Sequence, residues 1–331
     1  MLADITGLEV SPDEWPHPAR IGGHYEVLQA ELPAWLLSFG ILDDRQAELL
    51  VRTDYPLLVT LAWPDADETR SRDIGALAAT LATWDDEADD ERRDTRAGAV
   101  AHQLDSLRSG FSGTRTKWEP LYRSILGGFA TRMTARQFGR FSMCLERYVE
   151  GCLDWARVQL DGTGGPSAAE YARHRHLTVG QSIDMVLVEY ALGIDLGDAI
   201  LRNPAVRALQ HAHVEYIWLM QDLLSYRKEV ATDASSNIVT VLAASNGGRV
   251  QAAVDEAHRL LRAEIAGFEA ACDELSRSPL ADRPELWRYI AGLKDFTSGM
   301  VQWTNRSPRY DPAEYLRAQA TRSDEPTTTQ G

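Results

Sequence analysis

The sequence predicts an all-α fold in a single domain. Ala, Leu, Glu and Arg dominate the 331 residues and favour helices, whereas stretches with the alternating pattern of a β-strand are absent. Short runs rich in Gly, Pro, Asp and Ser divide the helical segments, at 63–71, 162–167, 195–198 and 231–237. The run at 162–167 is short for a domain linker, and no internal repeat divides the chain, so we favour one domain over two.

The composition narrows the class of protein and its partners. Hydrophobic residues make up 44% of the chain, which is enough for a sizeable core. The formal net charge of −15 argues against a nucleic-acid or anionic-membrane partner, but is compatible with local recruitment of metal cations. Three cysteines without metal-ligand spacing indicate a reducing, cytoplasmic location. We expect neither a membrane span nor a signal peptide, because no long apolar run and no basic N-terminal region is present.

The ends of the chain differ from its middle. Residues 1–20 contain Pro12, Pro16 and Pro18 and predict an irregular N-terminal arm. Residues 313–331 end in a polar run that is typical of a flexible tail. We therefore expect the folded domain to span residues 21–312.

An acidic cluster at residues 82–94 continues the apolar face of a predicted helix. That face consists of residues spaced by three and four, namely Ile74, Leu77, Ala78, Leu81 and Ala82. The same steps lead on to Asp85, Asp86 and Asp89, with Asp90 as the alternative to Asp89. Because these carboxylates extend the apolar stripe instead of opposing it, they can converge on one or two Mg²⁺ ions. A charged helix end that runs into solvent gives the same pattern, and the cluster alone does not separate the two interpretations.

Capping residues mark the starts of two further predicted helices. Ser167 and Glu170 form a capping box, which predicts a helix directly after the 162–167 run. Asn203 and Pro204 stand at the N-cap and at the first position of a long helix.

The helix that begins at Pro204 carries a second group of oxygen-bearing side chains. Its apolar stripe passes through Val214 and Ile217 and ends in Gln221, Ser225 and Glu229. An amide, a hydroxyl and a carboxylate at one-turn intervals are hard ligands that suit another Mg²⁺. Taken alone, this group also fits a helix whose polar end has reached solvent.

Together the two groups resemble the metal motifs of class I terpene synthases, and of the bacterial members in particular. The first is DDEAD (85–89), and the second is QDLLSYRKE (221–229). The diphosphate-sensing arginine of that family lies in a segment similar to YARHRHLTVG (171–180), which makes it Arg175, 46 residues before Gln221. The C-terminal Arg-Tyr pair resembles WTNRSPRY (303–310), and RTDYPLL (52–58) also fits the pattern. One departure is Gln221, where the family usually has Asn with a side chain one methylene shorter.

The resemblance implies an antiparallel helical bundle of the class I terpenoid synthase type with a central apolar cavity. The enzyme would ionise a linear prenyl diphosphate and cyclise the cation to a terpene hydrocarbon or alcohol, as a lyase of isoprenoid biosynthesis. The resemblance also implies three Mg²⁺ ions, for which Mn²⁺ could substitute. Their ligands would be Asp85, Asp86, Asp89, Gln221, Ser225 and Glu229. Binding of the diphosphate would fall to Arg175, Lys228, Arg309 and Tyr310.

Further residues take their roles from the same resemblance. Thr178 and Val179 match the linker and effector positions at a helix break near Gly180. The candidate cavity walls are Leu81, Ala82, Val179 and Trp303, with an ordinary core position as the alternative for Trp303. Family frequency favours farnesyl diphosphate (C15), whereas the small side chains of Leu81 and Ala82 favour the longer geranylgeranyl diphosphate (C20). The sequence does not determine the product skeleton. It also does not determine the oligomeric state, for which a homodimer is one alternative.

Two other functions compete with this interpretation. A chain-elongating prenyltransferase has a similar helical fold but carries two Asp-rich motifs, which disfavours it here. A non-enzymatic acidic helical protein that binds cations would leave Arg175 and Arg309 without a shared role. His174 and His176 have no third ligand at metal spacing in the sequence, and His211 and His213 do not share a helix face, so we expect no zinc site from them.

Overall fold

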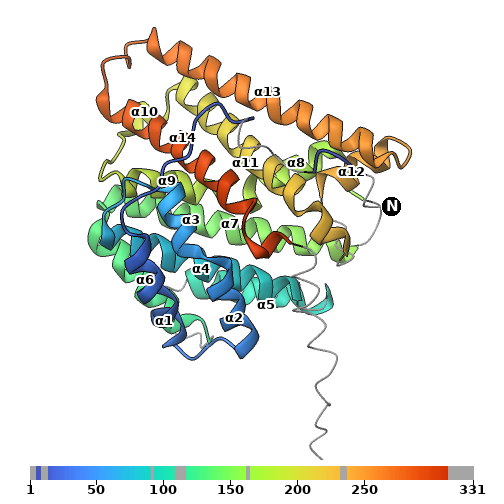
Figure 1. Ribbon diagram of the computed structural model, residues 1–331, viewed down its shortest axis with the longest axis horizontal. Helices are drawn as coiled ribbons and strands as arrows, with labels where there is room; N and C mark the ends of the chain where they lie inside the picture. Colours follow the sequence, from blue (N-terminus) through green and yellow to red (C-terminus); the bar gives the residue numbers. More distant parts are fainter. Residues whose placement is uncertain are drawn as a thin grey trace, which may run out of the picture.

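The computed structural model describes residues 5–8, 14–90, 93–108, 117–161, 165–231 and 237–311. Within these ranges the chain is helical and contains no strand, which confirms the predicted all-α fold (Figure 1). The predicted tail at 313–331, and parts of the arm, lie outside the described residues.

The helices follow one another with short connections. The N-terminal half consists of α1 (Tyr25–Leu37), α2 (Asp44–Thr53), α3 (Tyr55–Ala62), α4 (Glu68–Asp90), α5 (Arg93–Arg108), α6 (Glu119–Arg132) and α7 (Ala135–Asp161). The C-terminal half consists of α8 (Ala168–Thr178), α9 (Gln181–Ala191), α10 (Asp198–Leu201), α11 (Pro204–Ala231), α12 (Ile238–Ser245), α13 (Val250–Ser276), α14 (Pro284–Thr304) and the 3₁₀ turn η2 (Pro308–Tyr310).

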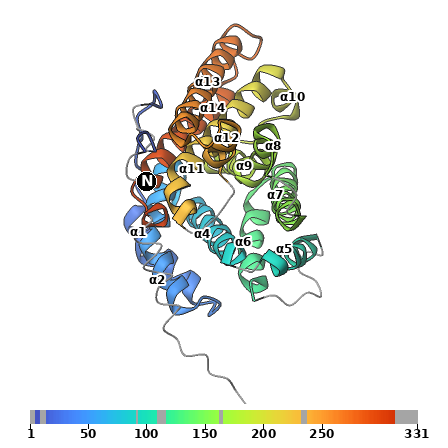
Figure 2. The ribbon, with the colours of Figure 1, turned by 90° about the vertical axis from the view of Figure 1, so that its right-hand side faces the viewer.

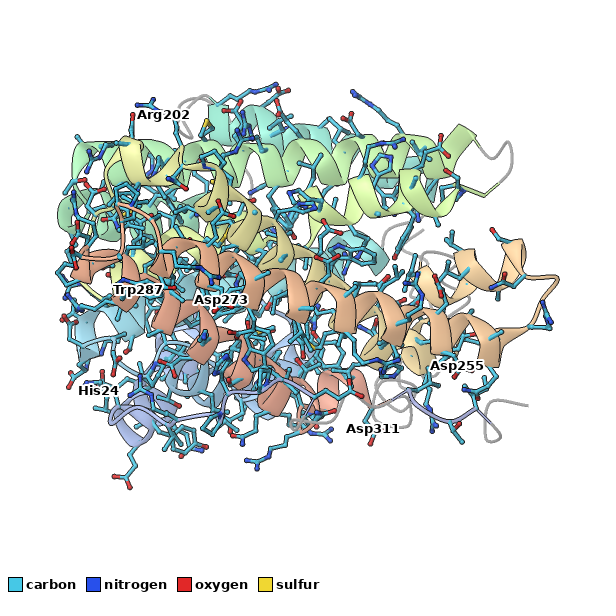
Figure 3. All side chains as sticks on the ribbon, turned by 90° about the horizontal axis from the view of Figure 1, so that it is seen from above. His24, Arg202, Asp255, Asp273, Trp287 and Asp311 are labelled. Carbon is cyan, nitrogen blue, oxygen red and sulfur yellow. The ribbon has the colours of Figure 1, made fainter. Side chains whose placement is uncertain are left out.

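The long helix α11 lies inside the bundle and α13 packs along it (Figure 1). Seen from the end in Figure 2, α13 and α14 lie on one side of the bundle and α5 and α6 on the other, with α4, α9 and α11 between them. From above, Asp255 and Asp273 mark the two ends of α13 (Figure 3). Leu209, Ile217 and Leu223 of α11 are fully buried, so apolar burial on several sides fixes this helix in the core.

α3 and α14 pack with their backbones in close contact. A Cβ added to Gly299 of α14 would lie 2.4 Å from the carbonyl carbon of Leu61 on α3. Only glycine allows this approach, because any side chain would push the two helices apart. The contact fixes α14, and η2 beyond it, against the N-terminal half of the chain.

The predicted helix starts are confirmed. Ser167 and Glu170 form the reciprocal capping box at α8, in which the Ser167 hydroxyl accepts from the Glu170 N–H. Asn203 precedes α11, its Oδ1 accepts from the N–H of Ala205 at 2.9 Å, and Pro204 is the first helical residue. These caps satisfy backbone N–H groups that a helix leaves without partners at its start.

The described part of the N-terminal arm is irregular but firmly packed. Trp15 is 2% exposed, its ring lies between Tyr216 and Phe268, and its Nε1 donates to the Lys294 carbonyl at 3.2 Å. The arm therefore contributes a large side chain to the core beneath α11, α13 and α14, which its prolines did not indicate.

The buried hydrophobic residues form one cluster that extends from Leu8 to Trp303. This continuity is what a single packed unit requires. Among the helices in the described ranges, none combines the length and the apolarity that crossing a lipid bilayer demands.

Candidate active site

α11 ends in the predicted row of oxygen-bearing side chains. Gln221, Ser225 and Glu229 follow one another at one-turn intervals, with Ser225 buried and the other two half-buried. The Glu229 carboxylate is hydrogen-bonded to Ser225 and accepts from Asn237 Nδ2 at 2.8 Å. Burial, and then the nearby Asp222 carboxylate, raise the pKa of Glu229. A divalent cation would offset both effects, so this set of hard oxygen donors fits Mg²⁺.

Asp222, directly after Gln221, holds Arg175 in place. Its side chain is 3% exposed, and its carboxylate accepts from Arg175 Nε at 2.9 Å, from the Tyr171 hydroxyl at 2.6 Å and from the Ile238 N–H at 2.9 Å. Burial raises the pKa of Asp222, and the Arg175 charge opposes that shift. Because the donors come from α8 and from the start of α12, one buried carboxylate joins both helices to α11.

Asn237 completes this junction. It caps α12, with its Oδ1 accepting from the Val239 N–H at 2.9 Å. Its Nδ2 donates to the Asp222 backbone carbonyl at 2.7 Å and to Glu229 at 2.8 Å. One fully buried amide therefore orients the last candidate ligand of α11 and the start of the next helix together.

A helix break lies near Gly180, as the resemblance to the family implies. α8 ends at Thr178, whose hydroxyl donates to the His174 carbonyl at 3.1 Å, and the Val179 N–H donates to the Arg175 carbonyl. Gly180 then takes a φ of 79°, a left-handed conformation that glycine adopts without strain, and α9 begins at Gln181. The chain changes direction here, a few residues after Arg175.

An aromatic pair connects this break with the last turns of α4. The Trp84 ring lies 6.3 Å from the Tyr148 ring of α7, in edge-to-face geometry. A Cβ added to Gly180 would lie 3.9 Å from Cε2 of the same Tyr148 ring. Trp84 directly precedes Asp85, so the pair brings the end of α4 towards the segment that carries Arg175.

The backbone of α4 is helical through Asp90, which puts Asp85 and Asp89 one turn apart as predicted. Leu81 and Ala82 are half-buried and pack against the core. The side chains of Asp85, Asp86, Asp89 and Asp90 lie outside the described residues. Their role as metal ligands is therefore still a prediction.

η2 carries the predicted Arg-Tyr pair and lies against α11 and α2 (Figure 1). Arg309 and Tyr310 are both half-buried, and the Tyr310 ring stands at 85° to the Trp303 ring with centroids 5.9 Å apart. Trp303 is 4% exposed and donates its Nε1–H to the carbonyls of Thr53 and Asp54 at 3.1 and 3.2 Å.

These contacts explain the RTDYPLL segment. Asp54 has a φ of 56°, ends α2, and caps α3 by accepting from the Leu57 N–H. The turn presents its carbonyls to Trp303, so it anchors the end of α14 next to η2. Trp303 therefore makes the contacts of a core residue that positions Tyr310, while its role as a cavity wall is untested.

Comparison with known proteins identifies the family. A family model described as terpene synthase family 2, C-terminal metal binding, matches residues 76–267, more than half of the chain. The chain belongs to this family. The synthase is thus an enzyme, a carbon–oxygen lyase that acts on phosphates. The matched range begins within α4 and includes the candidate metal ligands of α4 and α11 together with all of α8, which carries Arg175.

Relatives and solved structures agree with this family. The (+)-eremophilene synthase of Gibberella fujikuroi is 26% identical over 302 residues, covering 88% of this chain and 83% of its own. A Delta(6)-protoilludene synthase of Stereum hirsutum is 27% identical over 312 residues, with coverages of 89% and 85%. The structure of the linalool/nerolidol synthase of Streptomyces clavuligerus superposes with a TM-score of 0.76 at 18% identity, covering 88% of this chain and 98% of that one. The bacterial qualifier stays a prediction, because these sequence relatives are fungal.

Several residues of the site were not predicted. Asp222 and Asn237 belong to the second motif and the segment after it, but helical spacing marked only the positions that we predict to bind metal. Tyr171 and Tyr148 lie on other helices and carry no local signal. Trp84 did have a local signal in the sequence, because it directly precedes the acidic cluster on the same helix.

Proposed function

We propose that this synthase cyclises farnesyl diphosphate (C15) to a cyclic terpene with release of diphosphate. The observation that carries the proposal is the Arg175–Asp222 pair, which holds Arg175 against α11 next to Gln221 and so supports a role for Arg175 in binding the diphosphate. Family membership supports the reaction class. The names of the relatives, (+)-eremophilene synthase and Delta(6)-protoilludene synthase, support a C15 substrate.

The proposed metal ligands are Asp85, Asp86 and Asp89 on α4 and Gln221, Ser225 and Glu229 on α11. Mg²⁺ bound there, three ions by resemblance, would neutralise the diphosphate and polarise its ester C–O bond. The description of the family model as metal binding supports this use of a divalent ion. Gln221 offers the amide oxygen of the usual Asn on a longer arm, and its half-buried position leaves it room to adapt.

The cationic side chains bind and orient the leaving group. Arg175 donates its Nε–H to Asp222, which fixes the plane of the guanidinium and so the direction of its terminal nitrogens. Arg309 and Tyr310 on η2 would approach the same diphosphate from the side of α14, and Lys228 from α11. Each would bind the diphosphate anion more strongly as charge accumulates on it during ionisation.

The allylic cation left behind needs an environment without water. The proposed walls are Leu81, Ala82, Val179 and Trp303, and we also propose Trp84 and Tyr148, whose rings pack edge to face. Aromatic faces stabilise a cation without trapping it as a nucleophile would. Thr178 and Val179 would shape the region of the reacting carbons through the helix break, where the Val179 carbonyl is the effector group.

The second candidate substrate is geranylgeranyl diphosphate (C20). The small side chains of Leu81 and Ala82 on α4, both half-buried, favour it because they leave more volume than aromatic residues would. We further propose residues 21–312 as the catalytic domain, working in the cytoplasm.

A side-by-side assay tests the proposal. Purified protein is incubated with Mg²⁺ and with geranyl, farnesyl or geranylgeranyl diphosphate, and the organic extract is analysed by gas chromatography and mass spectrometry. We expect a cyclic C15 hydrocarbon or alcohol as the main product and no product with EDTA. A cyclic C20 product supports the second candidate. A longer prenyl diphosphate would indicate chain elongation, and unchanged substrates would refute the proposal.

A further inference from the structure

Three side chains from two helices converge outside the candidate active site. His176 lies on α8, and His211 and Glu215 lie one turn apart on α11. One ligand atom from each lies within 4.8 Å of the other two. His176 Nδ1 is 2.7 Å and His211 Nδ1 is 3.8 Å from the same Glu215 oxygen, Oε1.

The fold brings these residues together, since 39 positions separate His176 from Glu215. α8 is fixed to α11 by the contacts of Asp222 with Tyr171 and Arg175. His176 directly follows Arg175, so the same docking places its imidazole against α11. The sequence showed two histidine pairs without a third ligand, and the structure supplies that ligand from another helix.

The spacing of the three atoms suits a tetrahedral metal ion. Zinc binds nitrogen and oxygen ligands at about 2.0–2.1 Å, so two ligand atoms of one ion lie about 3.4 Å apart. The distances of 2.7 and 3.8 Å from Glu215 Oε1 fall on either side of this value. Each therefore needs a change of less than about 1 Å to reach the tetrahedral spacing. His211 has a side-chain exposure of 63%, which leaves the remaining coordination position open to water.

A hydrogen bond from Trp218 orients the Glu215 carboxylate. Its second oxygen, Oε2, accepts the Trp218 Nε1–H at 2.8 Å, and Trp218 is 2% exposed. Such a partner fixes the orientation of a metal-binding carboxylate.

We propose that His176, His211 and Glu215 form a binding site for one transition-metal ion of the Zn²⁺, Co²⁺ or Ni²⁺ class. Two imidazoles and one carboxylate suit these ions, whereas Mg²⁺ prefers an all-oxygen set. The bound ion joins α8 to α11 and so stabilises the fold. The site is separate from the ligand row at Gln221, Ser225 and Glu229, and it does not depend on the proposed function.

The test is a metal titration of the full chain, freed of any affinity tag, in excess MgCl₂. Excess Mg²⁺ occupies the oxygen-rich motifs and leaves the imidazole site to the added ion. We expect calorimetry with ZnCl₂ to show one saturable equivalent, and the thermal unfolding midpoint to rise with Zn²⁺. With CoCl₂ we expect the visible absorption bands of a low-symmetry cobalt site.

Two variants and a control assign the ligands. His211→Ala changes an exposed side chain, so folding is retained, and we expect at least a tenfold loss of Zn²⁺ affinity and the loss of the cobalt bands, with the same effect in His176→Ala. His174→Ala is the matched control, because His174 lies on α8 but packs on the Trp155 ring at 4.8 Å, away from the site. It should bind Zn²⁺ like the wild type.

Two results would overturn the proposal. Without saturable binding of one equivalent, the three residues form only an ion pair and a hydrogen bond. If His211→Ala and His176→Ala bind Zn²⁺ as tightly as the wild type and His174→Ala, the ion is held elsewhere.

Discussion

Asp222→Asn is the substitution that most directly tests how the fold positions Arg175. Asp222 accepts three hydrogen bonds, from Arg175, Tyr171 and Ile238, at 2.6–2.9 Å. An asparagine keeps the volume but has only one acceptor oxygen and no charge. At least one donor therefore loses its acceptor, and the guanidinium loses its counter-charge in a region where the Arg175 side chain is only 21% exposed.

The magnitude follows from this burial. Removing one partner of a buried ion pair costs about 3–5 kcal/mol. Because the Arg175 side chain is partly exposed to solvent, we expect a cost near the lower end of this range. Against a typical domain stability of about 5–15 kcal/mol, the variant still folds. We expect kcat/KM with the prenyl diphosphate to fall by about 100-fold, because a displacement of about 1 Å in a positioning group has an effect of this size.

The assay compares folding and activity in the same variants. Urea unfolding gives the change in the free energy of unfolding. The rate of product formation gives kcat/KM. Asp195→Asn is the matched control, since Asp195 accepts from Thr134, Arg136 and Arg140 near the start of α11, at the opposite end from Asp222. It should lower stability and leave kcat/KM close to that of the wild type.

A double-mutant cycle with Arg175→Gln isolates the pair. If Asp222 acts through Arg175, adding Asp222→Asn to Arg175→Gln should lower kcat/KM little beyond the effect of Arg175→Gln alone. The reasoning is refuted if Asp222→Asn keeps wild-type kcat/KM, or if its effect multiplies fully with that of Arg175→Gln.

Four further predictions concern the other parts of the site and the core. Asp85→Ala and Arg175→Ala should each abolish product while far-UV circular dichroism stays unchanged; turnover in either would remove its assigned role. Gln221→Ala should raise the Mg²⁺ concentration for half-maximal rate by about tenfold or more, because it removes one oxygen ligand; an unchanged Mg²⁺ dependence excludes Gln221 from the ligand set. Asn237→Ala should lower unfolding stability by about 1–3 kcal/mol, since it removes the donor that the buried Asp222 carbonyl and the half-buried Glu229 carboxylate share; a loss below the error of the urea experiment would contradict this. His213 is wholly buried, and burial lowers its pKa to about 3, so the stability of the wild type relative to His213→Gln should fall by about 1.4 kcal/mol per pH unit from about 6.5 towards 3 and stay constant above pH 6.5; a difference that does not change with pH would refute it.

Local signals in the sequence carried much of the fold. The capping residues Ser167 and Asn203 predicted two helix starts to the residue. The capping signals work because they satisfy backbone groups within a few residues. The break between α8 and α9 near Gly180 was implied by the resemblance to the family. The buried position of Trp15 was not predictable, because it depends on side chains of α11 and α13 that lie more than 200 residues away in the sequence.

The same distinction applies to the site. The row of oxygen-bearing side chains on α11 was predictable because helical spacing places Gln221, Ser225 and Glu229 on one face, and their role as metal ligands stays a prediction. Asp222 falls between those positions, and its partners come from α8 and α12, so only the tertiary structure shows what it does. The His176–Glu215 contact was missed for the same reason.

The central claim is that the ends of α4 and α11 bind one diphosphate through shared divalent ions. A crystal structure with Mn²⁺ and an unreactive farnesyl diphosphate analogue tests it most directly, because anomalous scattering locates each ion. The account predicts ions ligated by Asp85 on one side and by Ser225 and Glu229 on the other, with Arg175 on the same diphosphate. Ions bound to only one helix, or a diphosphate out of reach of Arg175, would contradict it.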